Sequence, residues 1–312
     1  MLTSDAILHT VSAGAGSIVH QMTAYGGRKA PYQRAIPLST GYVPLASGPQ
    51  MEDATQTFLG HLGVETVKEA RQMSSADLIL ANAKTIGASQ WTSFTFGPTV
   101  DGDLVPALPG ISFTNGQFDQ DVAVMTGHTA HEGPVFSPPN VTTNADFTAY
   151  IESLFPAHQD GAVEYMLSEL YPEETIDRTL QVIGDIGIAC NTDYLRRAYN
   201  NQTYNYRFDV APGIHASDIP YLFYSGPEPE DVDGGIWVGP SGYVQAALAR
   251  VLQGYVVNFS KFGDPNGAGL PLFPVSGTNQ SMQFLEASGV TVRRDTTANG
   301  RCAWLQKGPY VY

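Results

Sequence analysis

Helical and strand-like hydrophobic patterns alternate along this chain, and turns rich in Gly and Pro separate them. This alternation is typical of an α/β protein, in which helices cover a central sheet. The clearest helix spans about residues 241–262, where apolar side chains recur on one face. Gly263-Asp264-Pro265-Asn266 ends it, because Gly accepts a left-handed cap and Pro cannot continue a helix.

No internal repeat, charge block or low-complexity linker interrupts the 312 residues, so we predict a single α/β unit without a domain boundary. The other predicted elements are helices at 13–25 and 175–200, strands at 121–125 and 203–208, and a hairpin of strands 282–285 and 290–292.

Composition argues against several classes of protein. Hydrophobic residues make up 43% of the chain and charged residues 15%, which supports a folded core rather than disorder. The formal net charge of −14 argues against binding to nucleic acid and to anionic membrane surfaces. No apolar run approaches the roughly 18 residues of a membrane span. The first five residues lack the basic and apolar regions of a signal peptide.

Other features point outside the cell. The Asn-x-Ser/Thr acceptor sites for glycosylation are Asn140, Asn201, Asn258 and Asn279. Two cysteines, Cys190 and Cys302, permit one disulfide or are two buried thiols. No Cys/His cluster has the spacing of metal ligands, so we predict neither a metal nor another cofactor.

Ser12 is a candidate nucleophile. It opens the segment SAGAG at 12–16, between a short apolar segment and a predicted helix. A nucleophilic serine on a strand-to-helix turn needs small neighbours, because the turn is strained and the hydroxyl must stand clear of the backbone. The helix N-terminus behind it supplies backbone N–H groups for an oxyanion. The usual pattern is Gly-x-Ser-x-Gly, with Thr10 at its first position here, and the alternative is a Gly-rich turn that only opens a helix.

Glu132 and His215 are candidates for the acid and the base. Glu132 lies in the loop GHTAHEGPVF at 127–136, after a predicted strand, where a carboxylate can be held rigid beside an imidazole. His215 lies in APGIHASDIPYLF at 211–223, also after a strand, and can take the serine proton and return it to the leaving group. The alternatives are a surface glutamate and a structural histidine. Asp218 is a second candidate acid, although helix capping is favoured for it.

Together these segments resemble the type-B carboxylesterase and lipase family, which includes the cholinesterases, and most of all its secreted fungal members. Family members typically read GESAGA at the nucleophile, EG-x-x-F at the acid, and a histidine before an acidic residue and a Pro-Tyr-x-Phe-like strand. The matching residues are Ser12–Ala15, Glu132–Phe136, and His215 with Asp218 and Pro220–Phe223. The order Ser, Glu, His is that of α/β-hydrolases, and the resemblance covers essentially everything from Ser12 onward.

The resemblance implies an α/β-hydrolase fold and a carboxylic ester hydrolase that works through an acyl-enzyme. Ser12 would attack the ester carbonyl, His215 would act as general base and then acid, and Glu132 would orient the imidazole. The Ala13 N–H would donate to the oxyanion. The resemblance also implies a small-molecule or lipid ester as substrate, secretion from the cell, and a disulfide that joins the two cysteines, matching a C-terminal bridge of cholinesterase-like members.

The chain also departs from the family. In relatives a long segment precedes the nucleophile and holds the signal peptide, several strands and the His-Gly-Gly oxyanion loop. We therefore expect residues 1–312 to form the C-terminal portion of the domain, starting at the nucleophile elbow, with an incomplete sheet whose open edge promotes aggregation. Thr10 and Val11 replace the family's Gly-Glu and are expected to strain the turn. The alternative function is a catalytically silent, truncated hydrolase-like fragment or a binding protein.

Overall fold

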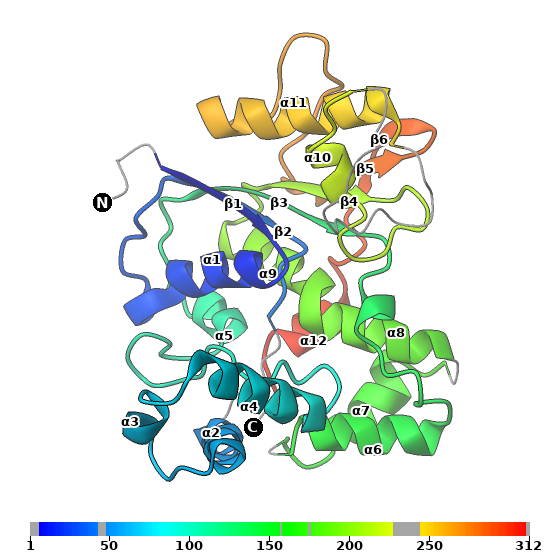
Figure 1. The fold of residues 1–312 in the computed structure, drawn as a ribbon. Coiled ribbons are helices and arrows are strands. Elements are labelled where there is room, and N and C mark those ends of the chain that lie inside the picture. Colours follow the sequence, from blue (N-terminus) through cyan, green and yellow to red (C-terminus); the bar gives the residue numbers. More distant parts are fainter. Residues whose placement is uncertain (1–5, 43–47, 157, 174–175, 227–243, 310–312) are drawn as a thin grey trace.

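A six-stranded sheet forms the centre of the molecule (Figure 1). The computed structural model describes residues 6–42, 48–156, 158–173, 176–226 and 244–309. The strands are β1 (Ile7–Val11), β2 (Arg34–Leu38), β3 (Ala123–Thr129), β4 (Tyr204–Phe208), β5 (Ser281–Glu286) and β6 (Gly289–Arg294). They lie in the order β1-β2-β3-β4-β5-β6. The first five run parallel, and β6 pairs antiparallel with β5.

Helices cover both faces of this sheet, as the predicted α/β class requires (Figure 1). The helices are α1 (Ala13–Thr23), α2 (Gly48–Leu62), α3 (Val67–Ala70), α4 (Ser75–Ala88), α5 (Pro109–Thr114), α6 (Asn144–Leu154), α7 (Ala162–Tyr165), α8 (Ile176–Gly184), α9 (Cys190–Ala198), α10 (Ile219–Leu222), α11 (Ala246–Phe262) and α12 (Gly300–Leu305). Val124 of β3 belongs to a hydrophobic core with α1, α5 and α9, whereas its neighbour Met125 belongs to a second core with α10 and α11. Successive strand residues point to opposite faces, so the two cores lie on either side of the sheet.

Most predicted elements occur with small shifts of their ends. The helix predicted at 13–25 is α1 followed by a 3-10 turn, the strand at 203–208 is β4, and the C-terminal hairpin is β5–β6. The helix predicted at 241–262 is α11, and residues 241–243 lie outside the described residues. Gly263 ends α11 in the left-handed conformation, with φ 74°, as its position predicts.

Two predicted elements differ from the structure. The strand predicted at 121–125 is β3, which continues to Thr129 because Gly127-His128-Thr129 pairs with β4 and is buried. These polar and small residues have the composition of a loop, and only their neighbours in the sheet make them a strand. The helix predicted at 175–200 is divided by a π-helical turn, Asp185–Ala189, between α8 and α9, and residue 175 lies outside the described residues.

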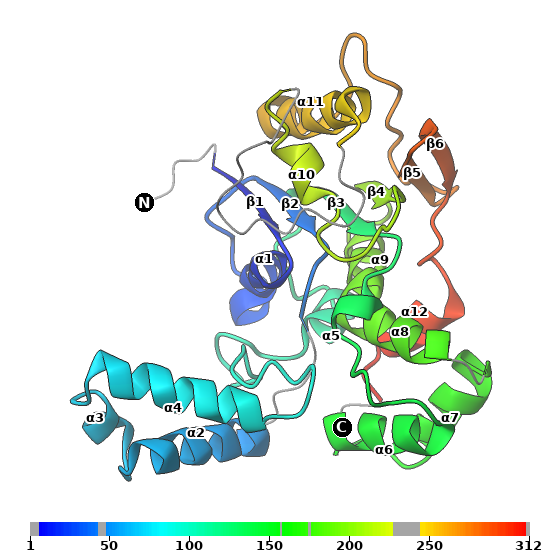
Figure 2. The same cartoon turned by 45° about the vertical axis from the view of Figure 1, so that its right-hand side comes forward.

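In the part of the chain that the structure describes, β1 pairs with β2 and with no other strand. It is therefore one edge strand of the sheet, and β6 is the other. Figure 2 shows a further feature that the sequence analysis did not predict, a lobe of α2, α3 and α4 set apart from the sheet. Within this lobe α2 packs against α4.

Candidate active site

Ser12 lies between the end of β1 and the start of α1, in a strained backbone conformation with φ 58° and ψ −127°. Non-glycine residues seldom adopt positive φ, and such strain persists where surrounding bonds fix the backbone. The Ser12 N–H donates to the Leu38 carbonyl over 2.9 Å, and the Ser12 carbonyl accepts from Gly16 and Gly41, each over 3.0 Å. Ala13 is the first residue of α1, so its N–H has no carbonyl partner within the helix.

The glycines around Ser12 are required by close contacts. A Cβ on Gly14 would lie 2.1 Å from Thr10 Oγ1, and one on Gly16 would lie 2.3 Å from the Gly41 carbonyl oxygen. Thr10 and Val11 belong to β1 and pair with β2, so the strain of the turn lies at Ser12 rather than at these two residues. Extended backbone suits β-branched side chains. The positive φ falls on Ser12 alone, and Thr10 fits because Gly14 leaves room for its side chain.

Glu132 follows β3 at a 3-10 turn, Gly133–Val135, and is 3% exposed. Its Oε2 lies 2.6 Å from His215 Nδ1. Its Oε1 accepts from the Thr129 N–H over 2.6 Å and from Ser39 Oγ over 2.7 Å. Burial by itself would raise the pKa of Glu132, but the hydrogen bonds and the charge of His215 hold the pKa of this carboxyl below its usual value. Glu132 is therefore an ionised carboxylate at neutral pH.

His215 lies in the turn after β4 and is 8% exposed. The turn is tied to the Glu132 loop, because the His131 N–H donates to the Gly213 carbonyl over 2.7 Å. Gly213 adopts φ 60° there, a conformation that favours glycine. The Phe136 ring packs edge-on against the imidazole, with ring centroids 4.8 Å apart. The imidazole is thus held by Glu132 on one side and by an aromatic ring on another.

Asp218 does not take the place of Glu132. The Tyr206 hydroxyl donates to Asp218 Oδ2 over 2.7 Å, and the carboxyl is fully buried. Burial raises the pKa of Asp218 to about 6, and the nearby charge of Glu132 adds to the rise. The helix-capping role favoured for Asp218 is only partly confirmed. Asp218 occupies the N-cap position of α10, but its side chain makes no capping hydrogen bond.

The site residues follow the carboxyl ends of four adjacent parallel strands. Ser12 follows β1, Ser39 follows β2, Glu132 follows β3 and His215 follows β4. Parallel strands bring such positions to one edge of the sheet, where α/β proteins place their ligands. Ser12 makes no side-chain hydrogen bond to His215 in the described residues. Ser12 is connected to the Glu132–His215 pair by hydrogen bonds at the end of β2. Leu38 accepts from the Ser12 N–H, and the next residue, Ser39, donates to Glu132.

Ser39 is a site residue that the sequence analysis missed. It adopts φ 43° and is fully buried. The available signal was the run Ser39-Thr40-Gly41, small and polar, directly after the apolar residues of β2.

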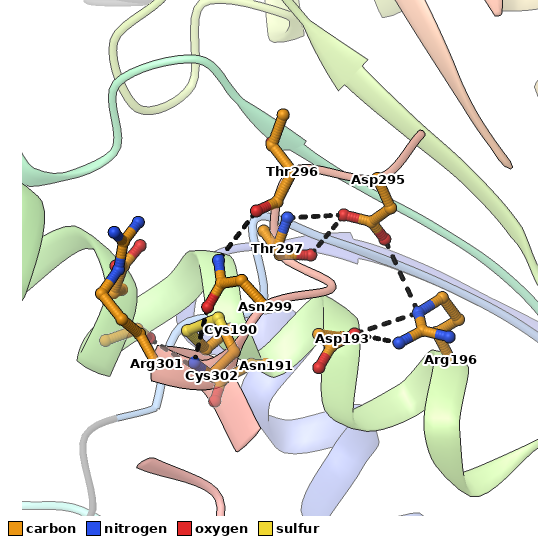
Figure 3. The surroundings of a disulfide bond; sticks show 12 residues. Cys190, Asn191, Asp193, Arg196, Asp295, Thr296, Thr297, Asn299, Arg301 and Cys302 are labelled. Carbon is orange, nitrogen blue, oxygen red and sulfur yellow. Dashed lines mark hydrogen bonds and ion pairs between the residues drawn. A yellow bond between two sulfur atoms is a disulfide. The ribbon is translucent and has the colours of Figure 1, made fainter. Parts of the chain in front are cut away.

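The two cysteines form the disulfide that the resemblance implies. Cys190 of α9 and Cys302 of α12 are bonded, with Cα atoms 5.0 Å apart (Figure 3). Beside it, Arg196 contacts both Asp193 and Asp295, so a buried ion network joins α9 to the segment before α12 (Figure 3).

The four glycosylation motifs differ in their surroundings. Asn140 and Asn279 are exposed. Asn201 accepts a hydrogen bond from Arg196, and the Asn258 amide donates to the carbonyls of Pro265 and Asn266, over 3.3 Å each. A glycan uses the same amide nitrogen, so a glycan on Asn258 would disrupt these two bonds.

Within the described residues, His, Cys, Asp and Glu side chains form no group of three or more that could hold a metal ion. The described helices also include none with the length and apolar character needed to cross a bilayer.

Comparisons with known proteins bear on the family and the fold. A family model described as the carboxylesterase family matches residues 6–304. Two fungal proteins named carboxylesterase patB, from Aspergillus clavatus and Penicillium expansum, are 33% and 31% identical to this chain. Each alignment covers 95% of this chain and 53% of the relative, so the chain spans about half the length of these proteins. The crystal structure of Aspergillus niger EstA has a TM-score of 0.82 at 21% identity, covering 98% of this chain and 65% of that one, which confirms the α/β-hydrolase fold. The chain therefore belongs to the carboxylesterase family.

Proposed function

We propose that this chain hydrolyses carboxylic esters through a catalytic triad of Ser12, His215 and Glu132. The observation that carries the proposal is the buried bond of 2.6 Å between Glu132 and His215 at the sheet edge that also bears the strained Ser12. A serine in this conformation presents its hydroxyl outward from the elbow, and a carboxylate–imidazole pair at the same edge provides its base.

Glu132 accepts the Nδ1–H of His215 and so leaves Nε2 free to take a proton. As Nε2 removes the hydroxyl proton of Ser12, Oγ bonds to the ester carbonyl carbon. The Ala13 N–H donates to the resulting oxyanion. The imidazolium then protonates the alcohol as the C–O bond breaks, which leaves an acyl group on Ser12. Water repeats these steps, releases the carboxylic acid and restores the serine.

The surroundings of His215 favour an ester with an apolar acyl or alcohol group. Phe136 packs on the imidazole, and Phe94 packs on Phe136 with ring centroids 5.7 Å apart. Phe94 is 56% exposed, so this aromatic row extends from the base to the surface. We therefore propose small-molecule or lipid esters as substrates.

Secretion is part of the proposal. A disulfide persists in oxidising compartments outside the cytosol. Cys190 and Cys302 form one that joins α9 to α12, and two glycosylation motifs, at Asn140 and Asn279, are exposed.

The alternative is a catalytically silent hydrolase-like protein. Each oxyanion donor contributes a factor of about 10²–10³ to kcat. Among the described residues we assign one such donor, the Ala13 N–H, and a shortage of donors would make the protein silent.

Labelling with a fluorophosphonate probe, together with hydrolysis of a p-nitrophenyl ester, tests the proposal. We expect the wild-type protein to be labelled and Ser12→Ala to abolish both labelling and hydrolysis. Ser17→Ala is the matched control, since Ser17 is an exposed serine of α1 whose hydroxyl donates to the Ala13 carbonyl. Labelling that persists in Ser12→Ala would refute the nucleophile. A folded wild-type protein without labelling would support the silent alternative.

A further inference from the structure

An open surface pocket of about 420 Å³, called the cavity below, lies among α6, the segment 162–170 and the start of α8. Its lining includes none of Ser12, Glu132 and His215. Both views show α6, α7 and α8 on one side of the molecule, away from α10 and α11 (Figures 1 and 2). The cavity therefore does not include the three proposed triad residues, although α8 also contacts the 3-10 turn that follows Glu132.

Two rows of polar side chains line this cavity. Asn144, Thr148 and Glu152 are spaced four residues apart and so share one face of α6. Glu164 and Ser168 show the same spacing in the segment 162–170. Polar groups at this regular spacing present a continuous row of acceptors and hydroxyl groups to a ligand.

Arg178 of α8 provides the positive charge of the cavity and is 6% exposed. Its Nη2 donates to Asn144 Oδ1, and its guanidinium lies over the Phe147 ring, 4.8 Å from the centroid. Its Nε has no hydrogen-bond partner, and no carboxylate forms an ion pair with Arg178, among the described residues. The charge of the guanidinium is therefore not neutralised by a described carboxylate, which favours an anionic group beside it.

The charges of the lining define the ligand. A guanidinium binds a carboxylate through two parallel hydrogen bonds. Glu152 and Glu164 would repel an anion without a positive charge, and they attract an ammonium group. Val163 and Leu167 add apolar surface to the same cavity.

We propose that this cavity binds a small zwitterion in which a short aliphatic chain joins a carboxylate to an ammonium group. The carboxylate contacts Arg178, the chain lies on Val163 and Leu167, and the ammonium lies near Glu152 and Glu164. Asn144, the partner of Arg178, and Glu152 are eight residues apart, which is about 12 Å along a helix axis. We therefore choose a chain of several methylene groups between the two charges.

Isothermal titration with 6-aminohexanoate tests the proposal, and hexanoate and hexylamine serve as probes that each lack one charge. We expect 6-aminohexanoate to bind with a millimolar or lower Kd and both singly charged probes to bind more weakly. Arg178→Leu should raise the Kd about tenfold or more, because it removes a charge-assisted pair of hydrogen bonds. Glu152→Gln combined with Glu164→Gln should raise it several-fold.

Arg250→Leu is the matched control, since Arg250 is an exposed arginine of α11 outside the cavity. Ser168→Trp fills the cavity without removing a charge and should also weaken the binding of 6-aminohexanoate. This variant tests the proposal if Arg178→Leu does not fold. Absence of 6-aminohexanoate binding up to about 10 mM would overturn the proposal. So would binding that survives both Arg178→Leu and Ser168→Trp. The titration needs no ester hydrolysis, so its outcome is independent of the proposed catalytic function.

Discussion

Asp218→Asn should make the protein more stable above pH 6 and should change the pH dependence of its stability. Asp218 is fully buried, and burial raises the pKa of its carboxyl from 3.8 to about 6. The folded protein therefore holds the Asp218 proton more tightly than the unfolded chain does. Wild-type stability from this group is fully present below about pH 4 and is lost as pH rises through about 6.

The rise in pKa sets the size of the effect. A difference between 3.8 and about 6 corresponds to about 3 kcal/mol of unfolding free energy, because one pH unit corresponds to 1.36 kcal/mol. Asparagine cannot ionise, so the variant avoids this loss. The asparagine carbonyl still accepts the bond from Tyr206, and exchanging the protonated carboxyl for an amide costs about 1 kcal/mol. We therefore expect the variant to gain about 2 kcal/mol at pH 8 and to be slightly less stable than the wild type at pH 4.

Urea unfolding of both proteins at several values between pH 4 and pH 8 measures this difference. Groups far from Asp218 titrate equally in the two proteins, so their contributions cancel, whereas the interaction with Glu132 is part of the measured difference. Tyr206→Phe is a second variant. The Tyr206 bond lowers the pKa of Asp218, so its removal should shift the loss of stability to higher pH. A difference between wild type and Asp218→Asn that stays constant with pH would refute the reasoning.

Three further predictions concern the site and the disulfide. Glu132→Gln should lower kcat about 10⁴-fold with little change in KM, because the amide cannot stabilise an imidazolium; if Asp218→Asn lowered kcat more, Glu132 would be the wrong acid. Ser39→Ala removes one bond to Glu132 and should raise the pKa of that carboxyl, so the carboxyl should titrate at higher pH by NMR in the variant than in the wild type, whereas an unchanged titration would contradict this role. Replacing Cys190 and Cys302 with Ala opens a link across 112 residues and should lower the unfolding free energy by about 4–5 kcal/mol in urea, while an unchanged midpoint would contradict the estimate.

The candidate acid and base were predicted through the resemblance of their segments to the family motifs, and the structure shows a steric demand in one of these segments. Gly133, for example, follows Glu132 because a Cβ there would lie 1.7 Å from the Leu180 carbonyl oxygen of α8. Ser39 could not be predicted, since its role depends on the pairing of β2 with β3 and on a backbone conformation that its own residue type does not favour. The number of cysteines alone did not decide between a disulfide and two thiols, because it gives no distance between the two residues.

The strained turn at Ser12 is fixed by two segments, residues 12–16 and residues 38–41, rather than by SAGAG alone. Ser12 and Ser39 both have positive φ, and each such residue costs of order 1–3 kcal/mol. The bonds that fix them are shared: Leu38 accepts from Ser12, Gly41 donates to Ser12, and Ser39 donates to Glu132 while its own N–H donates to Gly127. Residues 38–41 therefore hold Ser12 and Glu132 at once, and a change in this segment alters both. Contributions of residues in such a network are not additive, so the loss on removing Ser39 and Glu132 together should be smaller than the sum of the two single losses.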